Sequence, residues 1–128
     1  MALEVKADRM SVIIKLEEVA FTAVSIWFLS KYNLGLPVWI WALLFFSPDI
    51  SMLGYLVNPG PGAFCYNLFH HRSIALVMAA VGFYFQNDMV TAIGLLLLAH
   101  SSFDRMMGYG LKYNDSFKHT HLGWLNAK

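Results

Sequence analysis

The sequence predicts an all-α fold, an integral membrane four-helix bundle of up-down topology. Composition is the first observation behind this prediction: 58% of the 128 residues are hydrophobic and only 13% are charged, against about 25% charged in typical soluble proteins. The placement of the charges is the second. Residues 1–18 contain seven of them and residues 104–128 six, so the long stretch between contains only four. Because so few charges cannot cover the surface of a soluble fold, we expect the middle of the chain to lie in lipid.

Four segments are apolar over the roughly 20 residues that a helix needs to cross a bilayer. The expected spans are about 12–32, 37–57, 63–85 and 89–107, and with a cytoplasmic tail, 108–128, they form a single domain over 1–128. The first span ends near Asn33 and Gly35. The second begins at Pro37, which suits a first helical turn.

Strong breakers separate the later spans. Asn-Pro-Gly-Pro-Gly at 58–62 ends the second span, a short polar turn at 86–88 divides the third from the fourth, and Gly108 can stop the fourth. Such short connections place both termini and the 58–62 loop on one side of the membrane. That side collects eight of the nine Lys and Arg residues, and the other has only Lys31. The positive-inside rule then predicts that both termini are cytoplasmic.

Ionisable side chains inside a span are costly to keep and are therefore candidates for function. Each expected span has at least one in its cytoplasmic half: Glu17 or Glu18 on the first, Asp49 on the second, His70 on the third and His100 on the fourth. Asp49, for example, lies about 12 Å from the cytoplasmic end of its span at helical rise. The far half of every span is aliphatic or aromatic, so these polar groups share one layer.

This layer predicts a divalent metal site. His100 and Asp104 are four residues apart and share a helix face, and Asp49 and His70 come from the other spans. Imidazole and carboxylate ligands suit zinc, iron or manganese, and bundle cores commonly bind metals between facing helices. We expect these four residues to be the metal ligands, with Glu17 as a further ligand or general base. Water activated there would attack an ester or phosphoryl group of a lipidic substrate at the cytoplasmic headgroup level.

A structural role is the alternative for the same residues. Asp49 and the histidines can pair with Arg72 or Arg105 in a buried network that only holds the bundle together. In the tail, His119 and His121 are solvated unless the tail folds back under the bundle, in which case His121 contributes to the site.

Three segments resemble a known family of small bacterial membrane proteins, domain-of-unknown-function family 4260. They are SPDISMLGYLV (47–57), FCYNLFH (64–70) and AHSSFDRMMGYGLKYNDSFKHTHLG (99–123), and the likeness covers about residues 14–123. The AH-x3-DR-x2-GYGLKY block is the specific part. The family has no assigned activity to carry over. The resemblance implies site roles for its polar positions, which are Glu17, Asp49, Asn67, His70, His100, Asp104, Arg105, Lys112 and His121.

From this pattern we expect Glu17, Arg105 and His121 to be catalytic, and Asn67, Tyr109 and Lys112 to contact the substrate. His71 and Arg72 lie outside the expected match. A weaker likeness joins the chain to inner-membrane metal-dependent hydrolases, which have a Pro-Asp pair, a His-Arg pair and a late His-x3-Asp. Their Thr-His-Ser element is missing, because Arg72 is followed by Ser-Ile-Ala.

Three functions follow as hypotheses. The leading one is a metal-assisted enzyme of the inner (plasma) membrane, a hydrolase of a lipidic or amphipathic substrate. The second is a metal-free acid–base isomerase or cyclase acting on an apolar substrate. The third is a small ion-coupled transporter or a structural membrane subunit. The expected partners are membrane lipids and a hydrophobic small molecule, with a homo-oligomer left open. The net charge of +1 gives no argument for nucleic acid, and the single Cys65 allows no internal disulfide.

Overall fold

The computed structural model describes residues 1–125, apart from the side chains of residues 2–5 and 7. Over this part of the chain the fold is all-α, as predicted, with five α-helices and a β-hairpin whose two strands have two residues each. The elements are α1 (Ala2–Lys31), α2 (Val38–Phe45), the 3-10 helix η1 (Ser47–Leu56), α3 (Pro59–His70), α4 (Arg72–Tyr84), α5 (Asp88–Met106), β1 (His119–Thr120) and β2 (Gly123–Trp124).

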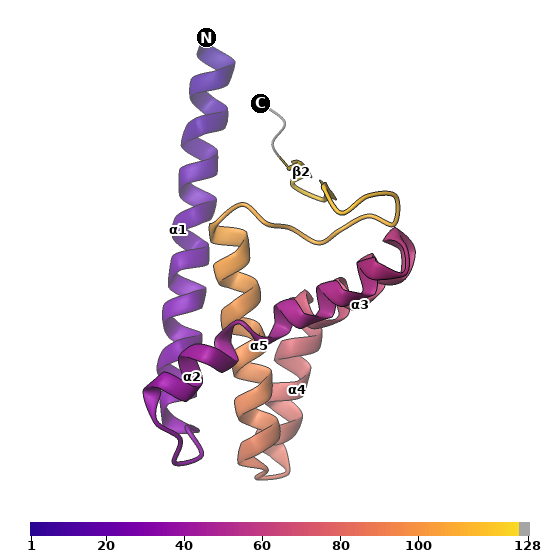
Figure 1. Cartoon of the computed structure of the whole chain (residues 1–128). Helices are drawn as coiled ribbons and strands as arrows, with labels where there is room; N and C mark the ends of the chain where they lie inside the picture. The colour runs from indigo at the N-terminus through magenta and orange to yellow at the C-terminus, as the bar shows by residue number, and fades with distance from the viewer. Residues whose placement is uncertain (126–128) are drawn as a thin grey trace.

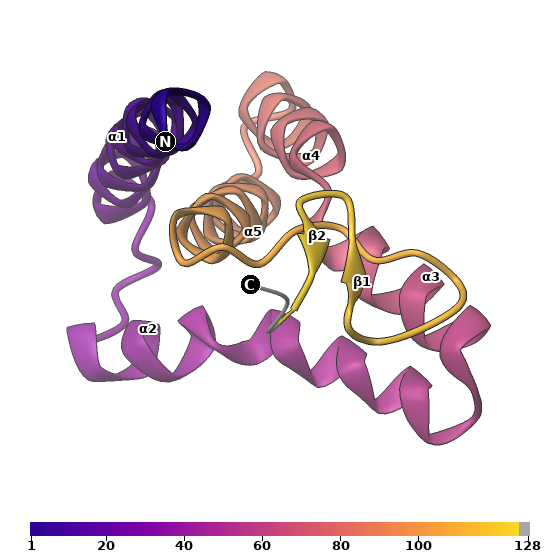
Figure 2. The same ribbon diagram turned by 90° about the horizontal axis from the view of Figure 1, so that it is seen from above.

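Helix α5 is the centre of the molecule. Helices α1 and α4 run alongside it and both pack against it (Figure 1). Seen from above, α1 and α4 lie on one side of α5, and the rod formed by α2 and η1 lies on the other (Figure 2). This rod crosses the bundle obliquely, and α3 returns along η1. The chain therefore has two layers that meet at α5.

Helix α1 is longer than the expected first span, because it begins at Ala2 and not near Val12. Residues 2–31 contain neither glycine nor proline, so no local signal stops the helix before that point. The chain then turns at Leu34 and Gly35, which have φ angles of 56° and 72°. Left-handed backbone of this kind ends a helix and directs the chain into α2.

The expected second span is two elements. Pro48 has no N–H to donate to Leu44, so the α-helix cannot continue through it. The chain proceeds as a 3-10 helix, in which the Asp49 N–H donates to the carbonyl of Phe46 at 3.2 Å. The carbonyl of Phe45 consequently has neither of its usual helical donors, Pro48 and Asp49. Its oxygen is left for a side chain of another helix.

The expected third span is also two elements. Helix α3 ends at His70, His71 is extended with φ −87° and ψ 117°, and α4 begins at Arg72. No glycine or proline marks this break in the sequence. The change of direction lets α3 pack against η1 while α4 packs against α5. A single straight helix could not make both contacts.

Small residues bring α4 and α5 into close contact. Ala75, Ala79 and Gly82 of α4 are buried and face Thr91 and Gly94 of α5. A Cβ atom added to Gly94 would lie 2.3 Å from the backbone nitrogen of Ala79. Close backbone approach through small residues is typical of helices packed in membranes.

Large apolar side chains mostly lie on the outside. The buried hydrophobic residues are largely alanines, whereas Phe21, Trp27, Trp39, Phe64 and Phe83 are all exposed. The largest fully buried side chains are polar: His100, Thr120, Ser25, Ser101 and Ser102. Within the described residues, one helical stretch, Val38–Leu56, is long and apolar enough by itself to cross a membrane. The multi-pass membrane bundle stays a prediction.

Residues 107–125, called the tail below, fold back over the end of α5 toward α3 (Figures 1 and 2). The β1–β2 hairpin pairs His119 with Trp124 and Thr120 with Gly123, and Lys112 bridges to Thr120. Thr120 is buried and its hydroxyl donates to the carbonyl of Gly123 at 2.7 Å. The tail is therefore an ordered part of the fold and lies within reach of the polar residues of α5.

Candidate metal centre

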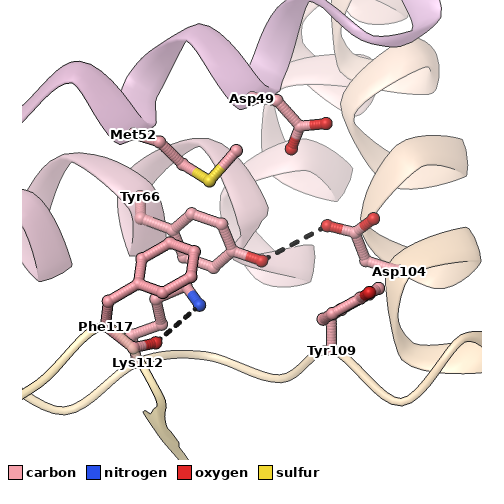
Figure 3. A pocket seen from close by; sticks show the side chains of 7 residues that line it. All are labelled: Asp49, Met52, Tyr66, Asp104, Tyr109, Lys112 and Phe117. Carbon is pink, nitrogen blue, oxygen red and sulfur yellow. Dashed lines mark hydrogen bonds between the residues drawn. The ribbon is translucent and has the colours of Figure 1, made fainter. Parts of the chain in front are cut away.

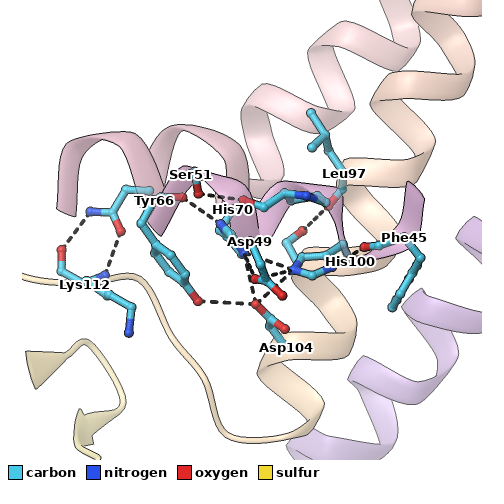
Figure 4. A network of polar contacts seen from close by, with 12 residues as sticks. Phe45, Asp49, Ser51, Tyr66, His70, Leu97, His100, Asp104 and Lys112 are labelled. Atoms are coloured by element: carbon cyan, nitrogen blue, oxygen red, sulfur yellow. Dashed lines mark hydrogen bonds and ion pairs between the residues drawn. The ribbon is translucent and has the colours of Figure 1, made fainter. Parts of the chain in front are cut away.

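The structure brings together the four residues that the sequence suggests as metal ligands. Asp49 comes from η1, His70 is the last residue of α3, and His100 and Asp104 lie one turn apart on α5 (Figure 4). One ligand atom from each lies within 4.8 Å of the others. We call this group the quartet. Its members come from three elements, so the group exists only in the folded chain.

The distances within the quartet are short and similar. His70 Nε2 and His100 Nε2 are 3.1 Å apart. Asp49 Oδ1 lies 3.3 Å from His70 Nε2 and 3.2 Å from His100 Nε2, and Asp104 Oδ2 lies 3.2 Å and 3.3 Å from the same two atoms. A tetrahedral ion with ligands at 2.0–2.1 Å has ligand–ligand edges of about 3.3–3.4 Å. Five edges of the quartet are therefore close to those of a tetrahedral site.

Both imidazole rings are oriented by backbone carbonyls. His70 Nδ1 lies 2.8 Å from the carbonyl oxygen of Tyr66, and His100 Nδ1 lies 2.6 Å from that of Phe45. Since a carbonyl oxygen only accepts, each Nδ1 must carry the proton and donate it. A neutral ring then has its Nε2 lone pair directed into the quartet. This is the arrangement that metal-binding histidines use, with the second nitrogen held by an outer group.

The two Nε2 atoms explain why the quartet needs a cation. At 3.1 Å, two unprotonated nitrogens beside two carboxylate oxygens would place only lone pairs against one another. Either a proton or a metal ion must lie between them. The buried Asp/His/His/Asp group can therefore hold a metal.

Burial gives the quartet a closed and an open side. His70 is 3% exposed and His100 1%, whereas the side chains of Asp49 and Asp104 are 34% and 14% exposed. The carboxylates line a pocket of about 340 Å³ (Figure 3). Met52, Tyr66, Tyr109, Lys112 and Phe117 complete its lining. A ligand in this pocket would meet the quartet from its carboxylate side.

Tyr66 is a site residue that the sequence reasoning missed. Its hydroxyl donates to Asp104 Oδ2 at 3.3 Å, and its ring stacks on His70 with centroids 3.8 Å apart. The signal was present, because Tyr66 lies four residues before His70 and therefore on the same helix face. One side chain thus holds a carboxylate of the quartet and covers one of its imidazoles.

The tail contributes two of the three residues expected to contact substrate. Tyr109 and Lys112 line the pocket. Asn67 does not line this pocket and instead holds Lys112: its Nδ2 donates to the Lys112 carbonyl at 2.8 Å, and its Oδ1 accepts from the Lys112 N–H at 2.7 Å. Asn67 is therefore a residue that positions the tail. Burial lowers the pKa of Lys112, and the carboxylates of Asp104 and Asp49 partly oppose that change.

None of the expected catalytic residues, which are Glu17, Arg105 and His121, is a member of the quartet. Glu17 is exposed on α1. Its neighbour Glu18 is buried and forms an ion pair with Arg72 of α4. Arg105 lies where the charges of Arg72, Glu18 and Asp104 act on it. We call Glu18, Arg72 and Arg105 the arginine cluster. The helices that contribute Glu18 and Arg72, which are α1 and α4, lie on the opposite side of α5 from η1 (Figure 2).

The period of an α-helix explains why α5 contributes residues both to the quartet and to the arginine cluster. At about 100° per residue, Asp104 is turned by about 40° from His100, whereas Arg105 is turned by about 140°. Arg105 therefore starts from a different face of α5 than His100 does.

His121 lies beside the arginine cluster. It accepts a hydrogen bond from the Leu111 N–H at Nδ1, over 2.8 Å. Partial burial and the positive charges of Arg105 and Arg72 lower the pKa of His121. The other tail histidine, His119, lies 2.8 Å from Asp115 and stacks on Trp124 with centroids 4.4 Å apart. Its hydrogen bond is the main cause that lowers the pKa of Asp115. Both histidines thus contact other residues of the tail.

Comparisons with known proteins identify the family and no named relative. No curated protein matches the chain, and no solved structure matches it. A family model described as "Domain of unknown function (DUF4260)" matches residues 11–125. This match covers the quartet, the arginine cluster and the tail, and it agrees with the likeness in residues 47–57, 64–70 and 99–123. The chain is a member of the DUF4260 family.

Proposed function

We propose that this protein is a membrane-embedded, metal-dependent hydrolase that acts on a lipidic or amphipathic ester at the level of the cytoplasmic headgroups. The observation that carries the proposal is the quartet: two imidazoles, each fixed through Nδ1 to a backbone carbonyl, present Nε2 to two carboxylates beside an open pocket. A site that only held helices together would not require a pocket at its carboxylates.

The residues of the quartet have separate tasks in this proposal. His70 and His100 hold the ion from the buried side, and Asp49 and Asp104 hold it from the pocket side. A divalent ion in the site would act as a Lewis acid and make water a stronger nucleophile near neutral pH. Tyr66, through its hydrogen bond, keeps Asp104 oriented toward the histidines. The pocket admits the ester to the same face.

The distribution of side chains supports the membrane part of the proposal. Large aromatic or aliphatic residues are exposed on every α-helix, while Glu18, His70, His100 and several serines and threonines are buried. Exposed apolar surface on this scale marks contact with lipid or with other proteins. The N-terminus and the tail lie toward one end of the molecule, the turns at 32–37 and 85–87 lie toward the other, and the turn between η1 and α3 lies between the two ends (Figure 1). This agrees with the basic residues of one side facing the cytoplasm.

Metal content is the direct test. The full chain, purified in detergent without chelators, should contain about one divalent ion per molecule by elemental analysis. Asp49→Ala should lose most of it, because one ligand is removed and three remain. Asp88→Ala is the matched control, since Asp88 is an exposed aspartate at the start of α5, and it should retain the ion. Metal-free wild type with full thermal stability would contradict the proposal.

Turnover separates the enzyme hypotheses. Ester cleavage by the wild type should stop after exhaustive chelation and return when the ion is added back. Cleavage that survives chelation would instead favour acid–base catalysis without metal.

The membrane part is tested by labelling. With Cys65→Ala as background, Gln86→Cys should react with an impermeant thiol reagent on intact cells. Asn114→Cys should react only after permeabilisation. Release of the protein by alkaline carbonate would contradict an integral membrane location.

A further inference from the structure

Lys112 is a buried cation with few partners. It is 5% exposed, and its Nζ donates one hydrogen bond, to the Phe117 carbonyl at 2.9 Å (Figure 3). An ammonium group has three N–H donors, so two have no partner in the part of the chain that the structure describes. The faces of Phe117 and Tyr66 lie 3.7 Å and 4.6 Å from Nζ and offset only part of the cost of burial.

The position of Lys112 is imposed by neighbouring elements. Asn67 of α3 holds both its N–H and its carbonyl. Phe117, which accepts from Nζ, packs edge-on against Tyr55 of η1 with centroids 5.1 Å apart. The tail is therefore attached to both walls of the pocket, and the ammonium group is held over the ring of Tyr66. The hydroxyl of the same ring reaches Asp104. One tyrosine separates the cation from the quartet.

Charge balance indicates what the pocket accepts. A divalent ion in the quartet would be neutralised by the carboxylates of Asp49 and Asp104. Among the described residues that line the pocket, Lys112 is then the one charge without an opposite charge. Met52, Tyr109 and Phe117 add apolar surface. The pocket therefore complements a group with one negative charge attached to an apolar body.

We propose that Lys112 binds the anionic oxygen of a phosphodiester and that the substrate is an amphiphilic phosphodiester, such as a phospholipid. This inference rests on the proposed function and names its substrate class. A neutral carboxylic ester has no charge for Lys112 to pair with. In the reaction, an oxygen of water forms the new bond to phosphorus and the bond from phosphorus to one alcohol breaks. One proton of water goes to the departing alcohol and the other to the phosphomonoester, so no oxidant or reductant is needed.

Binding to two matched probes tests the role of Lys112. The full chain in detergent, loaded with Zn²⁺, is titrated with dihexanoylphosphatidylglycerol, a monoanionic phosphodiester, and with dihexanoylglycerol, which has the same chains without phosphate. Thermal stabilisation reports binding. We expect the wild type to bind the phosphodiester more tightly than dihexanoylglycerol. Lys112→Met should weaken binding of the phosphodiester by about 10- to 100-fold and leave binding of dihexanoylglycerol unchanged.

Three controls separate charge from structure. Lys112→Arg keeps the positive charge and should retain most of the preference. Lys118→Met removes an exposed lysine of the same tail and should change nothing. Metal content and unliganded thermal stability are measured for every variant, so a Lys112→Met chain that merely misfolds is recognised. If it misfolds, Lys112→Gln is tested in its place.

The outcomes distinguish this inference from the function on which it rests. Equal binding of both probes, or a preference unchanged in Lys112→Met and Lys112→Gln, would overturn the inference while the metal site stands. Dihexanoylphosphatidylglycerol contains carboxylic esters as well as the phosphodiester, so its products identify the bond cleaved. Release of hexanoate would show cleavage of a carboxylic ester, which would overturn the phosphodiester assignment and leave the proposed hydrolase function in place. Tight binding without cleavage of a phosphorus–oxygen bond would overturn the assignment of the phosphodiester as substrate. If the chain contains no metal and cleaves neither kind of ester bond, the proposed function itself is refuted.

Discussion

His100 donates its Nδ1–H to the carbonyl oxygen of Phe45 at 2.6 Å, across 55 positions of the sequence. That oxygen is available because Pro48 has no N–H and because Asp49 donates instead to Phe46. A proline in the Ser-Pro-Asp stretch thus prepares an acceptor for one quartet residue immediately before the chain supplies another, Asp49. The same local change of helix type places both groups at α5.

Pro48→Ala should weaken metal binding more than it weakens the fold. Alanine allows the α-helix to continue, so the Phe45 carbonyl accepts from a backbone N–H and His100 loses its orienting partner. Loss of such outer contacts costs about 10–100-fold in metal affinity. Competition titration with a chromophoric chelator measures it. Pro37→Ala, at the exposed N-cap of α2, is the control, and equal affinities in the two variants would refute the role given to Pro48.

Tyr66→Phe should impair the centre without unfolding the chain. It removes the hydroxyl that donates to Asp104 and keeps the ring that stacks on His70. We expect metal affinity or turnover to fall about 10–100-fold, with a loss of stability of about 1 kcal/mol. Tyr55→Phe is the matched control, because the buried hydroxyl of Tyr55 has no hydrogen-bond partner among the described residues. If the two variants lose activity equally, Tyr66 has no special role.

Ala79→Leu should destabilise the protein, and Ala80→Leu should not. Ala79 is buried against Gly94, whereas Ala80 is exposed on the same helix. Overpacking a close helix contact costs about 1–3 kcal/mol, so Ala79→Leu should lower the melting temperature in detergent clearly below that of Ala80→Leu. A similar melting temperature for both variants would show that the α4–α5 interface is loosely packed.

Acidification should release the tail through His121. The folded pKa of His121 is lowered from the ordinary value of 6.5, so the unfolded tail binds the proton more readily than the folded one. The stabilisation is then fully present above about pH 6.5 and is lost as the pH falls from there through the folded pKa. Protonated Nδ1 also cannot accept from the Leu111 N–H.

Hydrogen–deuterium exchange of tail peptides, corrected for the intrinsic effect of pH, measures this release. Exchange over residues 107–125 should rise below about pH 6.5. His121→Phe should make the exchange independent of pH in that range, and a wild-type tail that stays equally protected at pH 5 would contradict the prediction.

The sequence alone was sufficient for the helical class and for the members of the quartet. Breakers and apolar runs predict helices because they act locally, and His100 and Asp104 share a face because four residues make about one turn. Asp49 and His70 were grouped with His100 and Asp104 because all four lie at a similar depth in the expected spans. The family likeness of residues 47–57, 64–70 and 99–123 is confirmed by the match over residues 11–125.

Local signals were insufficient where packing determines the backbone. His71 leaves the helix with no glycine or proline beside it, because α3 follows η1 and α4 follows α5. The position of a residue along the helix axis also does not specify which neighbouring element its side chain meets. Glu17 is exposed, Arg105 is not a member of the quartet, and Glu18 is the buried partner of Arg72.

The sequence by itself determined which ionisable side chains lie at the same depth in the molecule, because the rise per residue and the period are properties of a single α-helix. Only the tertiary structure decided which of them meet. The two faces of α5 divide the layer into a quartet on the η1 side and an arginine cluster on the α1 and α4 side, and the tail, held by Asn67, brings Lys112 to the first and His121 to the second. Contacts between distant segments carry no local period, so no pattern along the chain could specify them.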